Sequence, residues 1–238
     1  IIWGLERLVK EGKPVFYCLM LALSIFTNYY ISIMICIFLV LYFITLLVNN
    51  ESFIRPIWQF GVYSLLAGAL AAILLIPEVC AIMATDFGAM EFPKEIRSYF
   101  SVLDELARHQ MCVTTERQLE HWPNIYCGVA VFLLVPLFAV CKKISIKRRF
   151  VMLGLVLFLL FSFSTNLLDF IWHGMNYPDS LPARQSFIYI FLILVMCFEA
   201  FLHMREMDKQ VLVYSFLGAV AFLLFCEKFA VDKDISMG

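Results

Sequence analysis

Long, nearly unbroken runs of apolar side chains recur along the whole of this sequence, separated by short polar connections. As helices, runs of roughly 17–25 residues match the hydrocarbon core of a bilayer, which is about 30 Å thick. Water is absent there, so backbone amides and carbonyls must pair within each segment, which favours helices over open sheets. Apolar residues make up 63% of the chain and charged residues 16%, so much apolar surface must face lipid. The sequence therefore predicts an all-α fold, a polytopic integral membrane helical bundle.

Several stretches have the length and apolar content of a membrane span. A further stretch, residues 14–27, is too short to cross comfortably and is either a short crossing or a re-entrant half-helix. Pro77 and Pro136 lie inside two of the spans, where a proline leaves a backbone carbonyl unpaired and allows a kink. We expect about seven transmembrane helices, counting the short one. The longer spans are predicted at residues 30–48, 60–84, 122–141, 150–168, 186–203 and 211–226.

The positions of lysine and arginine predict the orientation of the bundle, because cytoplasmic connections are enriched in both. The most basic connection is residues 142–149, which we therefore place in the cytoplasm. With about seven crossings, residues 1–13, 49–59 and 204–210 fall on the same side, and the four segments hold 11 of the 18 lysines and arginines. The N-terminus of the chain is then cytoplasmic and its C-terminus is extracytoplasmic.

Charge and cysteine patterns exclude several classes of function. The formal net charge of −1 removes any whole-protein electrostatic argument for binding nucleic acid. The eight cysteines are scattered, without a C-x-x-C pair or a histidine at metal-binding spacing, so they are interpreted as small buried hydrophobes and no metal site is predicted. Because the chain starts at Ile1 with no signal-peptide pattern, we interpret residues 1–238 as a single transmembrane domain from a longer membrane protein.

The predicted outer loop at residues 85–121 contains an amphipathic pattern. Its apolar residues recur at helical spacing: Ile96, Tyr99, Phe100, Leu103, Leu106 and Ala107. Charged residues occupy the other faces: Lys94, Glu95, Asp104, Glu105 and Arg108. Pro93 suits the first turn of such a helix, because N–H groups in that turn make no hydrogen bond within the helix and the N–H that proline lacks is not needed. We expect an interfacial amphipathic helix on the outer side of the bilayer, or alternatively a lid that packs on the bundle.

Polar residues close to membrane depth are functional candidates, because their burial in lipid is costly. Asn28 and the two tyrosines after it lie at a predicted outer turn and are suited to a polar headgroup, although tyrosines at that depth are more often interface anchors. Glu78 stands near the outer end of a span, where its carboxylate is either a base, a partner for a cation or a solvated group. Glu199 and His203 are predicted to pair one turn apart, in a structural role.

The densest group of hydrogen-bonding side chains lies between two predicted spans, in the outer loop at residues 169–185 and just before it. So many polar groups beside lipid are costly unless something polar is bound there; the alternative is a solvated loop with a snorkelling arginine. Arg184 and Gln185 precede the next span, where a guanidinium suits a phosphate or carboxylate. Trp172 and Tyr177 offer ring faces to a sugar or a lipid stem. The cluster comprises Asn166, Asp169, Trp172, His173, Asn176, Tyr177, Asp179, Arg184 and Gln185.

Four blocks of the sequence carry a family resemblance. They are LERLVKEGKPVFYCLMLALSIFTNYYISIMICIFLVLYF at residues 5–43, HWPNIYCG at 121–128, FIWHGMNYPDSLPARQSFIYIF at 170–191 and EAF at 199–201. In these blocks the chain closely resembles the YfhO family of bacterial membrane proteins. Members of that family resemble polytopic glycosyltransferases of the GT-C superfamily, which take a sugar from a polyprenyl-phosphate carrier outside the cytoplasmic membrane, and some are linked to decorating teichoic acid-type polymers.

The resemblance implies a location, partners and a mechanism. We expect a multi-pass protein of the bacterial cytoplasmic membrane that uses a polyprenyl-phosphate-linked sugar and a cell-envelope polymer or lipid as acceptor. An acceptor hydroxyl would displace polyprenyl phosphate at the anomeric carbon, with a carboxylate as base and a cation, either a divalent metal ion or Arg184, beside the leaving phosphate. The family's catalytic carboxylate typically lies in an outer loop that would precede Ile1, so no catalytic residue is assigned in this chain.

Two other functions fit parts of the sequence. The W-H-G tripeptide at residues 172–174 is similar to the motif of membrane-bound O-acyltransferases, whose histidine activates an acceptor hydroxyl and is usually buried, whereas His173 is predicted in an outer loop. A flippase-like transporter of lipid or polymer would explain kinked spans with polar groups near one leaflet. The spans lack the paired mid-membrane charges and the inverted repeat that favour transport.

Overall fold

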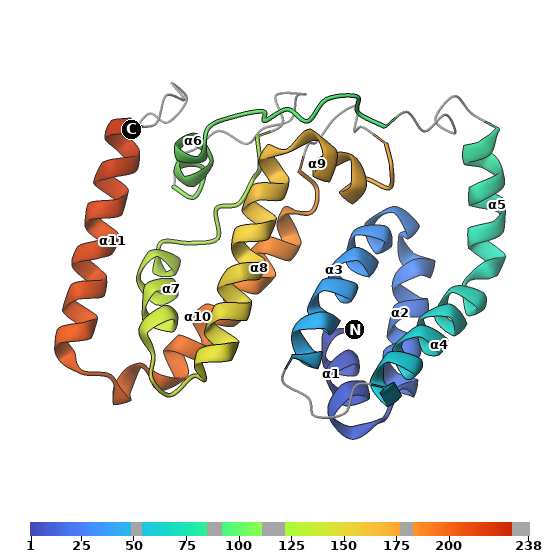
Figure 1. Ribbon diagram of the computed structural model, residues 1–238, viewed down its shortest axis with the longest axis horizontal. Coiled ribbons are helices and arrows are strands. Elements are labelled where there is room, and N and C mark those ends of the chain that lie inside the picture. The colour runs from blue at the N-terminus through green and yellow to red at the C-terminus, as the bar shows by residue number, and fades with distance from the viewer. Residues whose placement is uncertain (49–53, 85–91, 111–121, 177–182, 230–238) are drawn as a thin grey trace. The chain divides into compact units, whose positions relative to one another are not determined.

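The computed structural model describes residues 1–48, 54–84, 92–110, 122–176 and 183–229, and these are predominantly helical (Figure 1). Outside the helices, an isolated antiparallel bridge joins Ser98 to Thr165. The chain forms two compact units. Unit 1 comprises Ile1–Phe92 and Ile171–Asn176, and unit 2 comprises Pro93–Phe170 and Tyr177–Gly238. Each unit has its own packed helices, and the assignment of the whole chain to one transmembrane domain stays a prediction.

The apolar helices of both units are those of a membrane protein, as the sequence predicts. Three are long and apolar enough to cross a bilayer, at Tyr29–Leu47, Ser186–Glu206 and Lys209–Cys226. A bent pair, Ile54–Leu70 with Ala72–Met83, adds a fourth if it counts as one broken span. The described residues thus hold up to four candidate spans, and the finer count of about seven stays a prediction.

Unit 1 packs four helices around a shared core: α1 (Ile2–Glu11), α2 (Val15–Thr27), α3 (Tyr29–Leu47) and α4 (Ile54–Leu70). Helix α1 is amphipathic and buries Gly4, Leu5, Leu8 and Val9 against the other three. It ends at Gly12, whose left-handed backbone lets the N–H groups of Gly12 and Lys13 donate to the last turn of α1. The sequence places these residues in a cytoplasmic segment without predicting a helix there.

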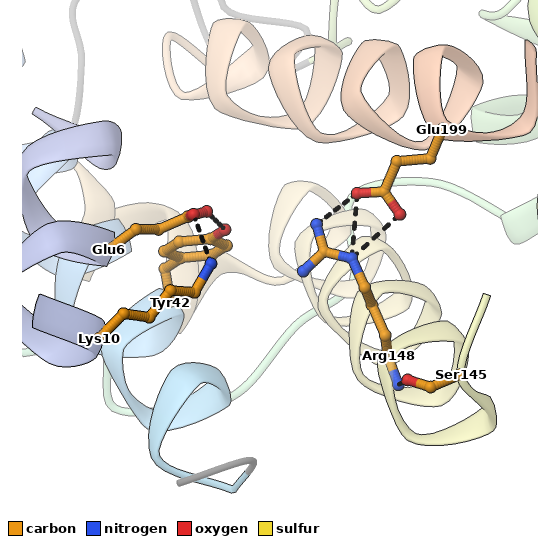
Figure 2. A network of polar contacts seen from close by, with 6 residues as sticks. All are labelled: Glu6, Lys10, Tyr42, Ser145, Arg148 and Glu199. Carbon is orange, nitrogen blue, oxygen red and sulfur yellow. Dashed lines mark hydrogen bonds and ion pairs between the residues drawn. The ribbon is translucent and has the colours of Figure 1, made fainter. Parts of the chain in front are cut away.

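Polar contacts at both ends of unit 1 fix how its helices meet. The carboxylate of Glu6 accepts hydrogen bonds from the Lys10 ammonium and the Tyr42 hydroxyl, both at 2.8 Å, which joins α1 to α3 (Figure 2). At the α2–α3 turn, the Asn28 side chain caps α3 by accepting from the N–H of Ile31 at 3.0 Å. This cap explains why α3 starts immediately after α2 ends.

A sharp bend separates α4 from α5 (Ala72–Met83). The two helix axes differ by 77°, and the break lies at Ala71. A proline disturbs the turn that precedes it, because its ring meets the carbonyl of the residue four positions earlier. Pro77 lies inside α5 and its ring meets the carbonyl of Ile73, so the bend at Ala71 precedes the turn that the proline disturbs, and the kink expected at Pro77 stays a prediction. No residue of α5 is buried in the structure.

Unit 2 is built on α7 (Ala130–Val140), α8 (Ile146–Ser164), α10 (Ser186–His203) and α11 (Lys209–Phe229), with α10 packed on both α7 and α8. The Arg148 guanidinium near the start of α8 forms a double hydrogen-bonded ion pair with Glu199 of α10 (Figure 2). The predicted pairing of Glu199 with His203 is therefore wrong. Arginine presents a planar fork that matches a carboxylate, whereas a histidine offers one donor at a time.

We expect the Arg148–Glu199 pair to couple α8 to α10 more strongly than an exposed pair couples the same region. Its side chains are 34% and 21% exposed, against 62% and 53% for the ion pair of Lys143 with Glu206. Double-mutant cycles with alanine should give a coupling free energy of about 1–2 kcal/mol for the first pair and roughly 0–0.5 kcal/mol for the second. Equal coupling energies in unfolding of the detergent-solubilised protein would contradict this.

Candidate functional site

An extended segment before α6 (Val102–Ala107) is bound to the end of α8. The N–H of Arg97 donates to the Asn166 side-chain oxygen and the Asn166 amide nitrogen donates to the carbonyl of Glu95, both at 2.9 Å. The N–H of Tyr99 donates to the carbonyl of Ser164 at 2.8 Å. Asn166 and Asp169 of the predicted cluster are both buried. Asn166 bonds to backbone groups, and Asp169 accepts a hydrogen bond from the Tyr99 hydroxyl. They position α6 over one end of unit 2.

Residues 101–110, here called the α6 cap, lie at the end of unit 2 opposite the basic connection between α7 and α8 (Figure 1). Ser101 starts α6 by accepting from the N–H of Asp104 at 3.3 Å. The helix is shorter than the amphipathic pattern predicts, because the preceding residues pair with α8 instead. Asp104, Glu105 and Arg108, which the sequence puts on faces other than the apolar one, are buried, and the interfacial position of the helix stays a prediction. The α6 cap packs against α8 and α11.

Glu105 is the most unusual group of the α6 cap. It is 3% exposed, and its Oε1 atom has no hydrogen-bond partner among the described residues. Burial disfavours the charged carboxylate and raises the pKa of Glu105 to about 8. At neutral pH the side chain is therefore mainly a neutral carboxylic acid, which both donates and accepts hydrogen bonds.

His109 links the α6 cap to the first turns of α10. Its Nδ1 lies 3.0 Å from the carbonyl oxygen of Leu106, and its Nε2 lies 2.7 Å from the Tyr189 hydroxyl. Burial lowers the pKa of His109, so the ring is neutral at pH 7. A carbonyl only accepts, so Nδ1 carries the proton and Nε2 accepts from Tyr189.

Two aromatic rings and a guanidinium lie beside these groups. Phe100 and Trp122 stack with ring centroids 4.6 Å apart, and both are half-buried. The Arg108 guanidinium lies 5.7 Å from the centroid of the Trp122 ring, and its Nε donates to the carbonyl of Pro123 at 3.4 Å. Carboxyl, imidazole, guanidinium and aromatic groups therefore gather at one end of unit 2.

Arg184 and Gln185 belong to the same unit, at the start of α10. Arg184 is half-buried. Gln185 is fully buried, and neither its Oε1 nor its Nε2 has a hydrogen-bond partner within the described ranges. Ala183 has a φ of 52°, a left-handed conformation that costs a non-glycine residue about 1 kcal/mol. Gln185 stands one helical turn before Tyr189, so it faces the same side of α10 as the His109 contact.

The other residues of the predicted cluster lie in unit 1 or outside the described residues. Trp172 and His173 are buried, 1% and 2% exposed, and the His173 ring lies 6.3 Å from the Tyr30 ring. His173 lies in a turn just after the helix that ends at Trp172, as predicted for a loop residue, but its side chain is buried. Asn176 is half-buried. Tyr177 and Asp179 lie outside the described residues, so their roles stay predictions.

The two remaining candidates, Asn28 and Glu78, lie in different environments. Asn28 is exposed and acts as the cap of α3, which is a sufficient structural reason for an amide at that turn. Glu78 is half-buried on α5, a helix without a buried residue. In the part of the chain that the structure describes, no group of three or more His, Cys, Asp or Glu side chains is placed to hold a metal ion. A divalent cation therefore stays a prediction.

The comparison with protein families decides the broad identity. The family model described as bacterial membrane protein YfhO matches residues 1–234. The chain belongs to the YfhO family. This confirms the resemblance, and with the apolar helices it places this YfhO-family chain in a membrane. No curated protein and no solved structure matches the chain.

Several residues at the polar end of unit 2 in this YfhO-family chain could not be predicted as site residues from the sequence. Glu105 and Arg108 look like ordinary polar-face residues, and Tyr189 looks like one aromatic residue among many in a span. One signal was available for Gln185, which precedes the long apolar run of α10 directly, so that its amide is carried to membrane depth. Nothing in the local sequence indicates that this amide is fully buried.

Proposed function

We propose that this chain is part of a membrane glycosyltransferase that moves a sugar from a polyprenyl-phosphate carrier to a cell-envelope polymer or lipid on the outer side of the membrane. The observation that carries the proposal is the polar end of unit 2, where Glu105, Arg108 and His109 of the α6 cap and Gln185 before α10 are all buried. Buried polar groups at one end of an apolar bundle are costly, which supports handling of a polar group beside the membrane surface.

The residue types at the polar end of unit 2 support transfer of a sugar from a lipid carrier more than the use of a soluble nucleotide substrate. A half-buried aromatic pair, Phe100 with Trp122, presents apolar faces of the kind that stack on sugar rings. Arg184 is the proposed partner for the phosphate of the carrier, because a guanidinium binds phosphate oxygens with two parallel hydrogen bonds. The predicted outer orientation of this end agrees with its position opposite the basic connection at residues 142–149.

The test uses the full-length protein in liposomes, with radiolabelled sugar on polyprenyl phosphate and a glycerol-phosphate polymer as acceptor. Arg184→Ala should lower transfer by about 100-fold, because an electrostatic contact to the leaving phosphate is lost. Arg205→Ala, an exposed arginine just after α10, is the matched control and should change transfer less than about twofold. Normal transfer by Arg184→Ala at normal expression would contradict the assignment of Arg184.

Acyl transfer is the second candidate, and one observation favours it. His173 lies in a turn, yet it is buried, as the histidine of membrane-bound O-acyltransferases usually is. The same liposomes supplied with a labelled acyl donor in place of the sugar donor separate the two functions. Acylation of the acceptor without glycosylation would replace the proposed function, and movement of labelled carrier between leaflets without either transfer would favour a transporter.

A further inference from the structure

We propose that Glu105 and Gln185 bind hydroxyl groups of the sugar when the α6 cap moves away from α10, an inference that rests on the proposed function. The sequence gives Gln185 only as a general headgroup candidate and gives Glu105 no role. Glu105 lies in the α6 cap, four residues before His109, whose Nε2 contacts the Tyr189 hydroxyl of α10, and Gln185 stands one helical turn before Tyr189.

Three side-chain atoms at this contact lack partners among the described residues: Oε1 of Glu105 and both Oε1 and Nε2 of Gln185. Leaving buried polar atoms unpaired is costly, and an apolar side chain of similar shape would remove that cost. The backbone just before Gln185 is also unusual, because Ala183 adopts a left-handed conformation that is costly for a residue other than glycine. Such groups are retained where they have a partner in another state of the protein.

The chemistry of the groups selects a hydroxyl-bearing ligand. A glutamine amide offers donors and an acceptor, and a neutral carboxylic acid does the same. A sugar hydroxyl also donates and accepts, so it pairs with either group. A phosphate only accepts near neutral pH and is repelled by any ionised fraction of Glu105. The guanidinium of the α6 cap, Arg108, contacts the Trp122 ring and donates to the Pro123 carbonyl.

Access requires movement of the α6 cap, because the three atoms are enclosed in the arrangement described. Two hydrogen bonds join the end of the cap to α10 and α11. His109 accepts from Tyr189 of α10, and the Gln110 amide donates to the carbonyl of Leu223 in α11 at 3.2 Å. Each of these hydrogen bonds contributes only a modest net free energy. New hydrogen bonds from a bound sugar to Glu105 and Gln185 would therefore compensate for breaking them.

Gln185→Leu tests the inference, because leucine keeps the volume and removes the amide. The variant should be at least as heat-stable as the parent in detergent, since no described hydrogen bond is broken. The parent should bind one of the polyprenyl-phosphate-linked sugars glucose, galactose or N-acetylglucosamine about tenfold more tightly than bare polyprenyl phosphate, and the variant should lose that difference. Gln210→Ala, at an exposed glutamine at the start of α11, should retain it.

Each outcome has one meaning. Sugar preference that survives in Gln185→Leu, or that is absent from the parent, overturns the inference. Marked destabilisation of Gln185→Leu also overturns it, because the amide would then have a structural partner. Glu105→Gln should keep the sugar preference, since a neutral amide still donates and accepts, whereas Glu105→Leu should lose it. Preserved sugar preference without any sugar transfer in the liposomes would count against the proposed function alone.

Discussion

Replacing Glu105 with glutamine is expected to make the detergent-solubilised protein markedly more stable than the parent at pH 9, and to change its stability little at pH 5. The reason is the burial of this carboxyl, which is 3% exposed and whose pKa is raised from 4.5 to about 8. Below pH 4.5 the group is neutral in both the folded and the unfolded chain. Between pH 4.5 and 8 it is ionised only in the unfolded chain, so stability falls as pH rises.

The size of this loss is set by the difference between the two pKa values. It amounts to roughly 3–5 kcal/mol by pH 8–9, and glutamine cannot ionise. We therefore expect the melting temperature of Glu105→Gln to exceed that of the parent by roughly 5–15 °C at pH 9. Glu206→Gln, at an exposed carboxylate, is the control and should show no such gain. The same dependence of melting temperature on pH in Glu105→Gln and the parent would show that Glu105 is not the buried acid described.

Adding one methyl group at Gly4 is expected to loosen α1 from α2. A Cβ atom there would lie 2.8 Å from the Cα and 2.9 Å from the backbone nitrogen of Tyr17. Backbone atoms cannot rotate out of the way, so the two helices must separate, at a cost of about 1–3 kcal/mol. Gly4→Ala should therefore lower the free energy of unfolding by that amount, measured by titration with a denaturing detergent.

A second glycine provides the matched control for this prediction. Gly61 lies inside α4 with no atom within 4 Å of an added Cβ. Gly61→Ala should therefore stabilise the protein by about 0.5–1 kcal/mol, because alanine restricts the unfolded chain and favours the helix. The two substitutions are chemically identical and are expected to have opposite signs. Equal effects would mean that α1 does not approach α2 as closely as the structure indicates.

Helix positions in this protein follow from local sequence to different degrees. Helix α10 occupies Ser186–His203, the predicted range, because a long apolar run with polar ends leaves little freedom in a bilayer. The predicted range of helix α7 differs from the observed one. The predicted span at residues 122–141 contains a helix only at Ala130–Val140, since the chain before it is drawn into contacts with the α6 cap. Hydropathy measures how apolar a segment is and carries no information on such tertiary contacts.

The candidate site was predictable only in part. Gln185 and Arg184 stand out in the sequence because they adjoin a span, and the structure keeps them at the start of α10. Glu105 does not stand out, because a charged residue on an amphipathic helix is usually exposed, and only the packing of α6 on α8 and α11 buries it. The partner of Glu199 was missed for a similar reason, as Arg148 lies 51 positions away in the chain.

Two of the apolar helices have a consequence for the surrounding lipid. Helix α2 has 13 residues and α7 has 11. At about 1.5 Å per residue they are roughly 20 Å and 17 Å long, well short of a hydrocarbon core of about 30 Å. A helix that is shorter than the acyl layer thins the bilayer beside it, which is hydrophobic mismatch. Under the proposed function, a carrier lipid that approached along α7 would meet a thinned membrane, in which its phosphate would lie deeper relative to unit 2 than in undisturbed lipid.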